Sequence, residues 1–172
     1  ESHANQQITT QTQAESFLHK LDEENDNMYI FSIGKSVKYG FDIPIVFFTK
    51  SDLSGCTTLE QVAQKLNKDG LPNIGYKAQM HGDEHAAGEG ALNVIKLLDK
   101  DESSYLLDAV NIFVIPRMNP DGAYKCKRNM ITAIDASFSN RDPNRDMLAL
   151  NIIEQRHYLN AIQLLDPVAE LD

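Results

Sequence analysis

The chain has 172 residues, of which 42% are hydrophobic, and this suits one globular domain with a sizeable core. Its formal net charge of -9 and its scattered lysines and arginines argue against a nucleic acid or an anionic membrane as a partner, because both require basic patches. No run of about 18 apolar residues occurs, so no membrane-spanning helix is expected, and the expected partners are proteins or small molecules.

The chain begins with a polar segment that carries no signal-peptide core. Residues 1–11 are expected to form a loose arm, and Thr12 is the expected cap of a short helix that runs to about Leu21. A polar start without an initiating methionine is typical of a mature chain after cleavage, or of a cloned fragment. We therefore expect an extracytoplasmic location, either periplasmic or secreted.

Strand patterns and helix patterns alternate along the rest of the chain. Segments rich in β-branched and aromatic residues are bounded by glycine, proline and asparagine, which is typical of strands. Other segments repeat their apolar residues at helical spacing, and the last of these is expected to bury Leu148, Ile152, Leu159 and Ile162. The expected strands are 28–33, 43–49, 74–80, 111–115 and 168–171, the expected helices are 57–67, 85–98 and 146–165, and 116–143 is expected to be irregular.

This alternation predicts an α/β fold in which a layered mixed sheet is flanked by helices. Ligands of such sheets usually bind beyond the carboxyl ends of the strands. Two motifs lie at those positions: HGDE at 81–84 follows one predicted strand, and NPDG at 119–122 follows the next. We expect the functional site to be built there.

The chain has two cysteines, Cys56 and Cys126, and they form no C-x-x-C pair. The sequence therefore predicts neither a zinc knuckle nor a redox motif, and it leaves open whether the two cysteines form a disulfide.

The segment QMHGDEHAAGEG, residues 79–90, concentrates histidines and acids where a predicted strand gives way to a predicted helix. His81 and Glu84 could converge on a metal ion, because a catalytic zinc takes about three nitrogen or oxygen ligands and keeps one position open. Two other interpretations stay open at this point. Glu84 could simply favour the start of a helix while His85 is a surface side chain. H-x-x-E-H is also the inverted zinc-peptidase signature, in which both histidines bind from one helix and Glu84 is the base, although Gly82 interrupts such a helix.

Three further motifs follow in order: IPRMNPDG at 115–122, KRN at 127–129 and RDPNRD at 141–146. Together with HGDE, and in this order, they resemble the zinc carboxypeptidase family, which contains carboxypeptidases A and B and their bacterial relatives. Four motifs in a fixed order are far more specific than any one of them alone.

The start of the chain also resembles that family. IGKSVKYGFDI at 33–43 is similar to the family's I-G-x-S-x-x-G-R-x-I hairpin, with Phe41 where arginine is usual. The resemblance covers about residues 29–172 and implies that residues 1–172 are the N-terminal portion of a single metallopeptidase catalytic domain, incomplete at the C-terminus. In the family, a third zinc ligand, which is a histidine, and later a glutamate base and a tyrosine complete the site. These groups are expected beyond Asp172, so the 172-residue segment alone is expected to be inactive.

The resemblance also implies roles for individual residues. His81 and Glu84 match the first two ligands of one Zn²⁺ ion. Arg128 matches the arginine that polarises the scissile carbonyl, and Asn144 and Arg145 match the pair that holds the terminal carboxylate of the substrate. A guanidinium fork suits that task, because it binds a carboxylate through two charge-assisted hydrogen bonds. The alternatives are that Arg145 is a surface arginine paired with Asp142 or Asp146, and that Arg128 is one more solvated charge beside Lys125 and Lys127.

The resemblance therefore predicts a zinc-dependent metallocarboxypeptidase, which hydrolyses the C-terminal peptide bond with a metal-activated water. Two alternatives stay open: a zinc-dependent deacylase of N-acyl amino acids, and a non-catalytic pseudo-peptidase that only binds carboxylates. In each case the expected partner is a peptide or an acylated amino acid with a free carboxylate. The side-chain specificity is not predicted.

Overall fold

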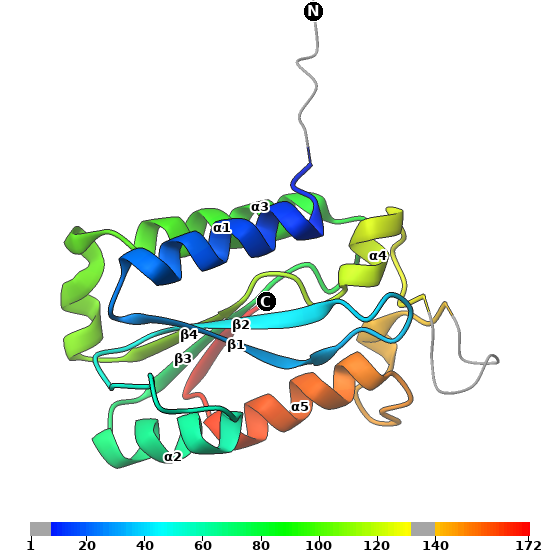
Figure 1. Ribbon diagram of the computed structural model, residues 1–172. Helices are drawn as coiled ribbons and strands as arrows, with labels where there is room; N and C mark the ends of the chain where they lie inside the picture. The colour runs from blue at the N-terminus through cyan, green and yellow to red at the C-terminus, as the bar shows by residue number, and fades with distance from the viewer. Residues whose placement is uncertain (1–7, 132–139) are drawn as a thin grey trace, which may run out of the picture.

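Five strands form one mixed sheet in the part of the chain that the computed structural model describes, residues 8–131 and 140–172. Helices cover both faces of the sheet, with α1 and α3 on one face and α2 and α5 on the other (Figure 1). The predicted α/β fold with a layered mixed sheet is therefore confirmed. The strands are β1 (Met28–Lys35), β2 (Asp42–Phe48), β3 (Asn73–Lys77), β4 (Asn111–Ile115) and β5 (Ala169–Leu171); the helices are α1 (Gln11–Glu24), α2 (Leu59–Asp69), α3 (His85–Leu98), α4 (Pro120–Lys125) and α5 (Ile153–Leu165), with short 3-10 helices η1 (Asp101–Asp108) and η3 (Pro143–Arg145).

The strands lie in the order β1-β2-β4-β3-β5. The β1–β2 and β2–β4 pairs are antiparallel, whereas β3 runs parallel to both β4 and β5. The carboxyl ends of β3, β4 and β5 therefore meet at one edge of the sheet. HGDE follows β3 and NPDG follows β4, so both motifs lie at this edge, where open α/β sheets bind their ligands.

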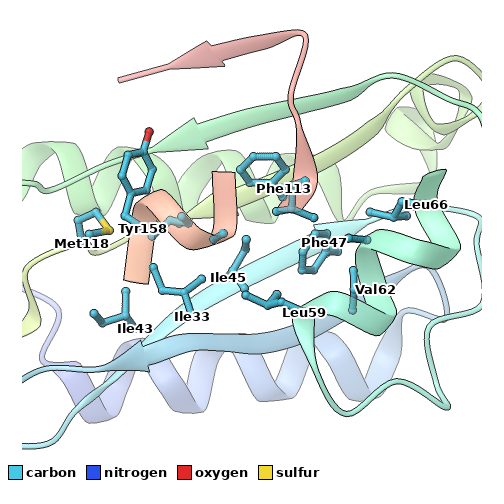
Figure 2. Close-up of a cluster of buried hydrophobic side chains, with 14 of the residues drawn as sticks. Ile33, Ile43, Ile45, Phe47, Leu59, Val62, Leu66, Phe113, Met118 and Tyr158 are labelled. Carbon is cyan, nitrogen blue, oxygen red and sulfur yellow. The ribbon is translucent and has the colours of Figure 1, made fainter. Parts of the chain in front are cut away.

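The core consists of two apolar layers, one on each face of the sheet. Alternate residues of β2 supply both layers, because successive side chains of a strand point to opposite faces. Ile45 and Phe47 pack toward α2 and α5, and Phe48 packs toward α1 and α3. Figure 2 shows the first layer, in which Phe47 lies beside Phe113 of β4 with their ring centroids 6.1 Å apart. In the described stretches no helix is long and apolar enough to cross a membrane.

The first helix begins two residues earlier than the sequence predicts. Thr10 is its cap: the Thr10 hydroxyl accepts a hydrogen bond from the Gln13 amide, and the Thr10 amide donates to the Gln13 side chain. This reciprocal pair satisfies two amides at the helix start, so the predicted cap at Thr12 is wrong. Residues 8–11 are the described part of the predicted arm, and Gln11 already belongs to α1; residues 1–7 lie outside the described residues.

Two boundaries near the motifs also differ from the prediction. The strand predicted to reach Met80 ends at Lys77, because Gln79 adopts a left-handed backbone conformation with φ of 51° that no strand accommodates. NPDG begins the short helix α4, with Asn119 as its cap and Pro120 in the first turn, inside the stretch predicted to be irregular. Residues 132–139 of that stretch lie outside the described residues.

The last helix begins at Ile153 rather than at Asp146, because Asp146 organises a loop instead. Its fully buried carboxylate accepts hydrogen bonds from the Ile152 amide at 2.6 Å and from the Asn151 side chain at 3.3 Å. The chain from 146 to 152 therefore wraps around this carboxylate. Leu148, which the helical pattern placed in the core, is fully exposed.

Two buried carboxylates hold the turn between β1 and β2. Asp121 of the NPDG motif accepts hydrogen bonds from the Ser36 hydroxyl at 2.6 Å and the Lys38 amide at 2.7 Å. Glu154 of α5 accepts one from the Val37 amide at 3.0 Å. Burial raises the pKa of Glu154 and the charge of Asp121 adds to this, while hydrogen bonds from the Val37 amide and its own amide oppose the rise.

Replacing Glu154 by glutamine should change how stability depends on pH. The pKa of Glu154 in the folded protein lies above the ordinary 4.5, so its contribution to stability is present below pH 4.5 and is lost as the pH rises through the folded-state pKa. Glu154→Gln keeps an acceptor for the Val37 amide but cannot ionise. Its free energy of unfolding should therefore rise relative to wild type across this pH window and then level off. Denaturant unfolding at several pH values measures this, with the exposed Glu23→Gln as control; parallel pH curves for Glu154→Gln and wild type would contradict it.

Candidate metal centre

A cavity of about 450 Å³ opens at the carboxyl edge of the parallel strands. His81, Glu84 and Asn144 line it, together with Lys77 of β3 and Asp172, which follows β5. Residues from three separate parts of the chain thus face one space. Three of the predicted site residues therefore line one cavity.

His81 and Glu84 are brought together by the turn between β3 and α3. Glu84 is the residue that precedes α3, and its amide donates a hydrogen bond to the His81 carbonyl at 3.1 Å. The His81 side chain is buried, whereas the Glu84 side chain is half exposed. His81 Nδ1 and Glu84 Oε1 lie 3.1 Å apart. The two predicted metal ligands therefore face each other.

The other nitrogen of His81 faces Asp142. His81 Nε2 lies 3.1 Å from Asp142 Oδ1, so each nitrogen of the ring faces a carboxylate, which can only accept a hydrogen bond. A metal ion bound between Nδ1 and Glu84 would take the lone pair of Nδ1 and leave the ring N–H on Nε2 for Asp142. Such a pair suits one divalent ion, since two ligand atoms about 2.1 Å from a tetrahedral zinc lie about 3.4 Å apart. Among the described residues no group of three histidine, cysteine, aspartate or glutamate side chains converges on one metal position.

Asp142 lies in the RDPNRD motif, but the sequence analysis assigned it no role at the site. Partial desolvation acts to raise its pKa, but hydrogen bonds from His81 and the Asn144 amide, with the charges of His81 and Arg145, leave the pKa below the ordinary value. A histidine that binds a metal usually donates its other N–H to a carboxylate or carbonyl, which fixes the ring. That rule predicts a partner for His81, but 61 residues separate the two side chains, and the RDPNRD motif that contains Asp142 does not by itself say that it contacts His81.

Arg128 reaches the same pair from the chain after α4. Its Nη1 donates to Glu84 Oε1 at 2.9 Å, and both side chains are half exposed. The Arg128 carbonyl also accepts a hydrogen bond from the Gly82 amide at 3.1 Å, which ties its backbone to the HGDE turn. The guanidinium thus lies next to the Glu84 carboxylate, within reach of a group bound beside it.

Asn144 and Arg145 lie on η3 and are placed differently. Asn144 Nδ2 is 3.4 Å from His81 Nε2, and Asn144 lines the cavity. Arg145 is exposed and is not among the cavity-lining residues; its Nη1 donates to the Asn144 carbonyl at 3.2 Å. The structure therefore brings Asn144 to the site directly, whereas a substrate-binding role for Arg145 stays a prediction.

The inverted histidine scheme does not hold. His81 lies before α3 and His85 is the first residue of that helix, so the two histidines do not share one helical face. His85 Nδ1 contacts the Gln79 side chain at 3.2 Å, and His85 lines a different cavity, of about 560 Å³, with Tyr39 and Tyr124.

The HGDE and NPDG motifs are packed backbone to backbone. A Cβ atom on Gly82 would lie 2.2 Å from the carbonyl carbon of Gly122, a distance that real contacts do not tolerate. Gly122 in turn donates its amide to the Asn119 side chain at 2.8 Å. Position 82 therefore requires glycine, because only a residue without a side chain lets the HGDE backbone pack against the NPDG backbone.

These features define the class of protein. It is an α/β protein with one mixed sheet and a histidine–glutamate pair, suited to a divalent metal, at the carboxyl edge of its parallel strands. The model of the zinc carboxypeptidase family matches residues 14–152, and the chain belongs to that family.

Curated relatives and solved structures agree with this assignment. Carboxypeptidase M of Mus musculus is 32% identical over 114 residues, which are 63% of this chain and 23% of that protein. Carboxypeptidase 2 of Trichophyton rubrum is 28% identical over 138 residues, 79% of this chain and 23% of that protein. The chain thus spans about a quarter of the length of these relatives.

Similar folds occur in solved metallo-carboxypeptidases. The enzyme of Burkholderia cenocepacia superposes with a TM-score of 0.69 at 17% identity, covering 92% of this chain and 39% of that one. The enzyme of Pseudomonas aeruginosa, in complex with (2-guanidinoethylmercapto)succinic acid, gives a TM-score of 0.67 at 21% identity, covering 94% and 38%. At such identities the likeness supports the fold alone.

Substituting Gly82 by alanine should disrupt the site. The added methyl group would meet the Gly122 backbone, which cannot move as a flexible side chain would, so we expect a loss of stability of about 2–3 kcal/mol and weaker zinc binding. Gly90→Ala is the matched control, because a Cβ there meets nothing within 4 Å and alanine favours a helix interior by roughly 0.5–1 kcal/mol. Thermal unfolding and zinc titration of both variants test this; equal behaviour of the two would show that the contact between the motifs is dispensable.

Proposed function

We propose that the full-length protein is a zinc-dependent metallocarboxypeptidase, of whose single catalytic domain residues 1–172 form the N-terminal portion. The observation that carries the proposal is the arrangement of His81. Its ring lies between two carboxylates, with Nε2 3.1 Å from Asp142 and Nδ1 3.1 Å from Glu84, so a metal on Nδ1 and Glu84 would leave Nε2–H for Asp142. Membership of the zinc carboxypeptidase family supports zinc as the ion for this pair.

His81 and Glu84 would hold the zinc ion, and a histidine that follows Asp172 in a longer chain is the proposed third ligand. The topology supports that position, because β5 runs parallel to β3 and leads to Asp172 in the same cavity as His81. When bound, zinc supplies a Lewis acid and a bound water whose pKa falls toward about 7. The two protein ligands are held before any metal arrives.

Arg128 and the η3 residues would orient the substrate. The Arg128 guanidinium uses Nη1 for Glu84, and its remaining N–H groups can donate to the carbonyl oxygen of the peptide bond. Donors placed where negative charge develops on that oxygen are worth about 3 kcal/mol each. Asn144, and Arg145 after a rotation of its exposed side chain, would bind the free terminal carboxylate of a peptide.

Two other functions use the same residues. A deacylase would release an amino acid from its N-acyl derivative, and a pseudo-peptidase would bind carboxylates without hydrolysis. The His81–Glu84–Asp142 arrangement favours a metal enzyme over a pure binder, because a binder has no need of it. An extracytoplasmic location is part of the proposal, and fractionation of the native cells tests it.

Removing the histidine ligand should abolish zinc binding in the full-length protein. His81→Ala deletes one ligand and leaves Glu84 with only Arg128 as its counter-charge, so we expect less than a tenth of the wild-type zinc content and no hydrolysis. The exposed His19→Ala should retain both. Metal analysis, with assays on a peptide and on an N-acyl amino acid, decides between the functions: zinc without hydrolysis of either substrate would favour the pseudo-peptidase, and hydrolysis of the acyl derivative alone would favour the deacylase.

Arg145→Lys tests the grip on the carboxylate. Lysine keeps the charge but cannot form the two parallel hydrogen bonds of a guanidinium, so KM for peptides should rise about 10- to 100-fold with kcat little changed. Arg156→Lys, at an exposed arginine of α5, is the matched control and should have no effect. The same kinetics with Arg145→Lys as with wild type would remove Arg145 from the substrate site.

A further inference from the structure

Gln79 connects the end of β3 to the HGDE turn in an unusual conformation. Its φ of 51° lies in the left-handed region, which costs a residue with a side chain of order 1 kcal/mol or more. The residue is almost fully buried, and its carbonyl accepts a hydrogen bond from the Asn119 amide at 3.2 Å. Surrounding contacts therefore hold this conformation, and it directs the Gln79 side chain under the turn that carries His81 and Glu84.

The side-chain amide of Gln79 makes three contacts whose directions are fixed. Its Oε1 accepts from Arg117 Nε at 2.8 Å, and its Nε2 donates to the Gly82 carbonyl at 3.1 Å. A guanidinium can only donate and a carbonyl can only accept, so the amide has one possible orientation. The third contact, from Nε2 to His85 Nδ1 at 3.2 Å, must then be a hydrogen bond that His85 accepts. This places the His85 ring proton on Nε2.

Arg117 anchors this amide from the opposite side. It is buried, and its two terminal nitrogens donate to the Gln11 side chain at 3.1 Å and to the Thr9 carbonyl at 2.9 Å. The helix α3 leaves room for the contact, because a Cβ on Gly88 would lie 2.2 Å from Gln79 Oε1. Gln79 is thus held between a buried guanidinium and the metal-binding turn.

We propose that Gln79 is a positioning residue for the metal centre. Its amide ties the Gly82 carbonyl and the first residue of α3 to the sheet, on the two sides of Glu84. Glu84 has no side-chain cap bond of its own and is half exposed, so this tie, together with the backbone contacts of Gly82, limits the freedom of the turn between the two proposed ligands. The inference rests on the proposed zinc site, and partners that orient metal ligands typically contribute 10- to 100-fold to metal affinity.

The test compares two buried glutamines that share Arg117 as a partner. Gln79→Met removes the acceptor for Arg117 and the donors to the turn, whereas Gln11→Met removes an acceptor for Arg117 and donors to Glu15 and the Asp42 carbonyl but leaves the contacts of Gln79 with the turn in place. Zinc affinity of the full-length protein is measured by chelator competition, and thermal unfolding of the metal-free protein is measured in parallel. We expect both variants to unfold at lower temperature, but only Gln79→Met to lose zinc affinity, by about 10- to 100-fold.

Gln79→Glu adds a second readout and serves if Gln79→Met fails to fold. It keeps an acceptor for Arg117 but places a carboxylate against His85 Nδ1 and the Gly82 carbonyl, so zinc affinity should fall. The ring proton of His85 should move from Nε2 to Nδ1, which ¹⁵N chemical shifts report. Unchanged zinc affinity in the Gln79 variants, or equal losses in Gln79→Met and Gln11→Met, would overturn the inference. A wild-type protein that binds no zinc would instead overturn the proposed function, and this inference with it.

Discussion

The contact between Gly82 and Gly122 is the constraint on which the site depends. It lets the chain that leaves β3 touch the chain that leaves β4 without an intervening side chain. Because of this contact, His81 emerges at the carboxyl edge of the sheet, and the Gly82 amide can bond to the Arg128 carbonyl. A backbone contact thus accompanies the Arg128–Glu84 ion pair in bringing the two proposed metal ligands and the guanidinium together.

Buried carboxylates perform a comparable task in the irregular parts of the chain. Asp121, Asp146 and Glu154 each accept backbone amides from loops that have no regular partner. A buried amide without a partner is costly, so these acids define the loop conformations as firmly as a strand ladder would. Asp121 explains why the I-G-K-S hairpin and the NPDG motif occur together: one residue of the second motif bonds the turn of the first.

The sequence was most informative where apolar periodicity decides the structure. The helix 85–98 and the strand 111–115 were predicted with the observed bounds, because each follows a clear pattern with a clear end. The family resemblance named His81, Glu84, Arg128 and Asn144, which the structure brings together.

The sequence was least informative where tertiary contacts override local pattern. The helical spacing wrongly predicted that Leu148 is buried. The Asp146 carboxylate accepts a hydrogen bond from the Ile152 amide, and the helix begins only after this loop. His157 of α5 is partly buried and its ring lies against Gly34, a contact between residues far apart in sequence. Asp142 stands in the RDPNRD motif and Gln79 shortly before HGDE, but no spacing rule reveals that their side chains contact His81 and the Gly82 carbonyl.

The ion pair between Arg128 and Glu84 bears on how the protein would load its metal. Without metal, the guanidinium already neutralises the carboxylate, so arrival of a divalent cation is an exchange of one positive partner for another. An incoming ion would meet the half-exposed Glu84 carboxylate first, because the His81 imidazole is buried. In the proposed enzyme, a metal that displaces Arg128 Nη1 from Glu84 would add this N–H to the donors that the guanidinium can offer to a substrate carbonyl.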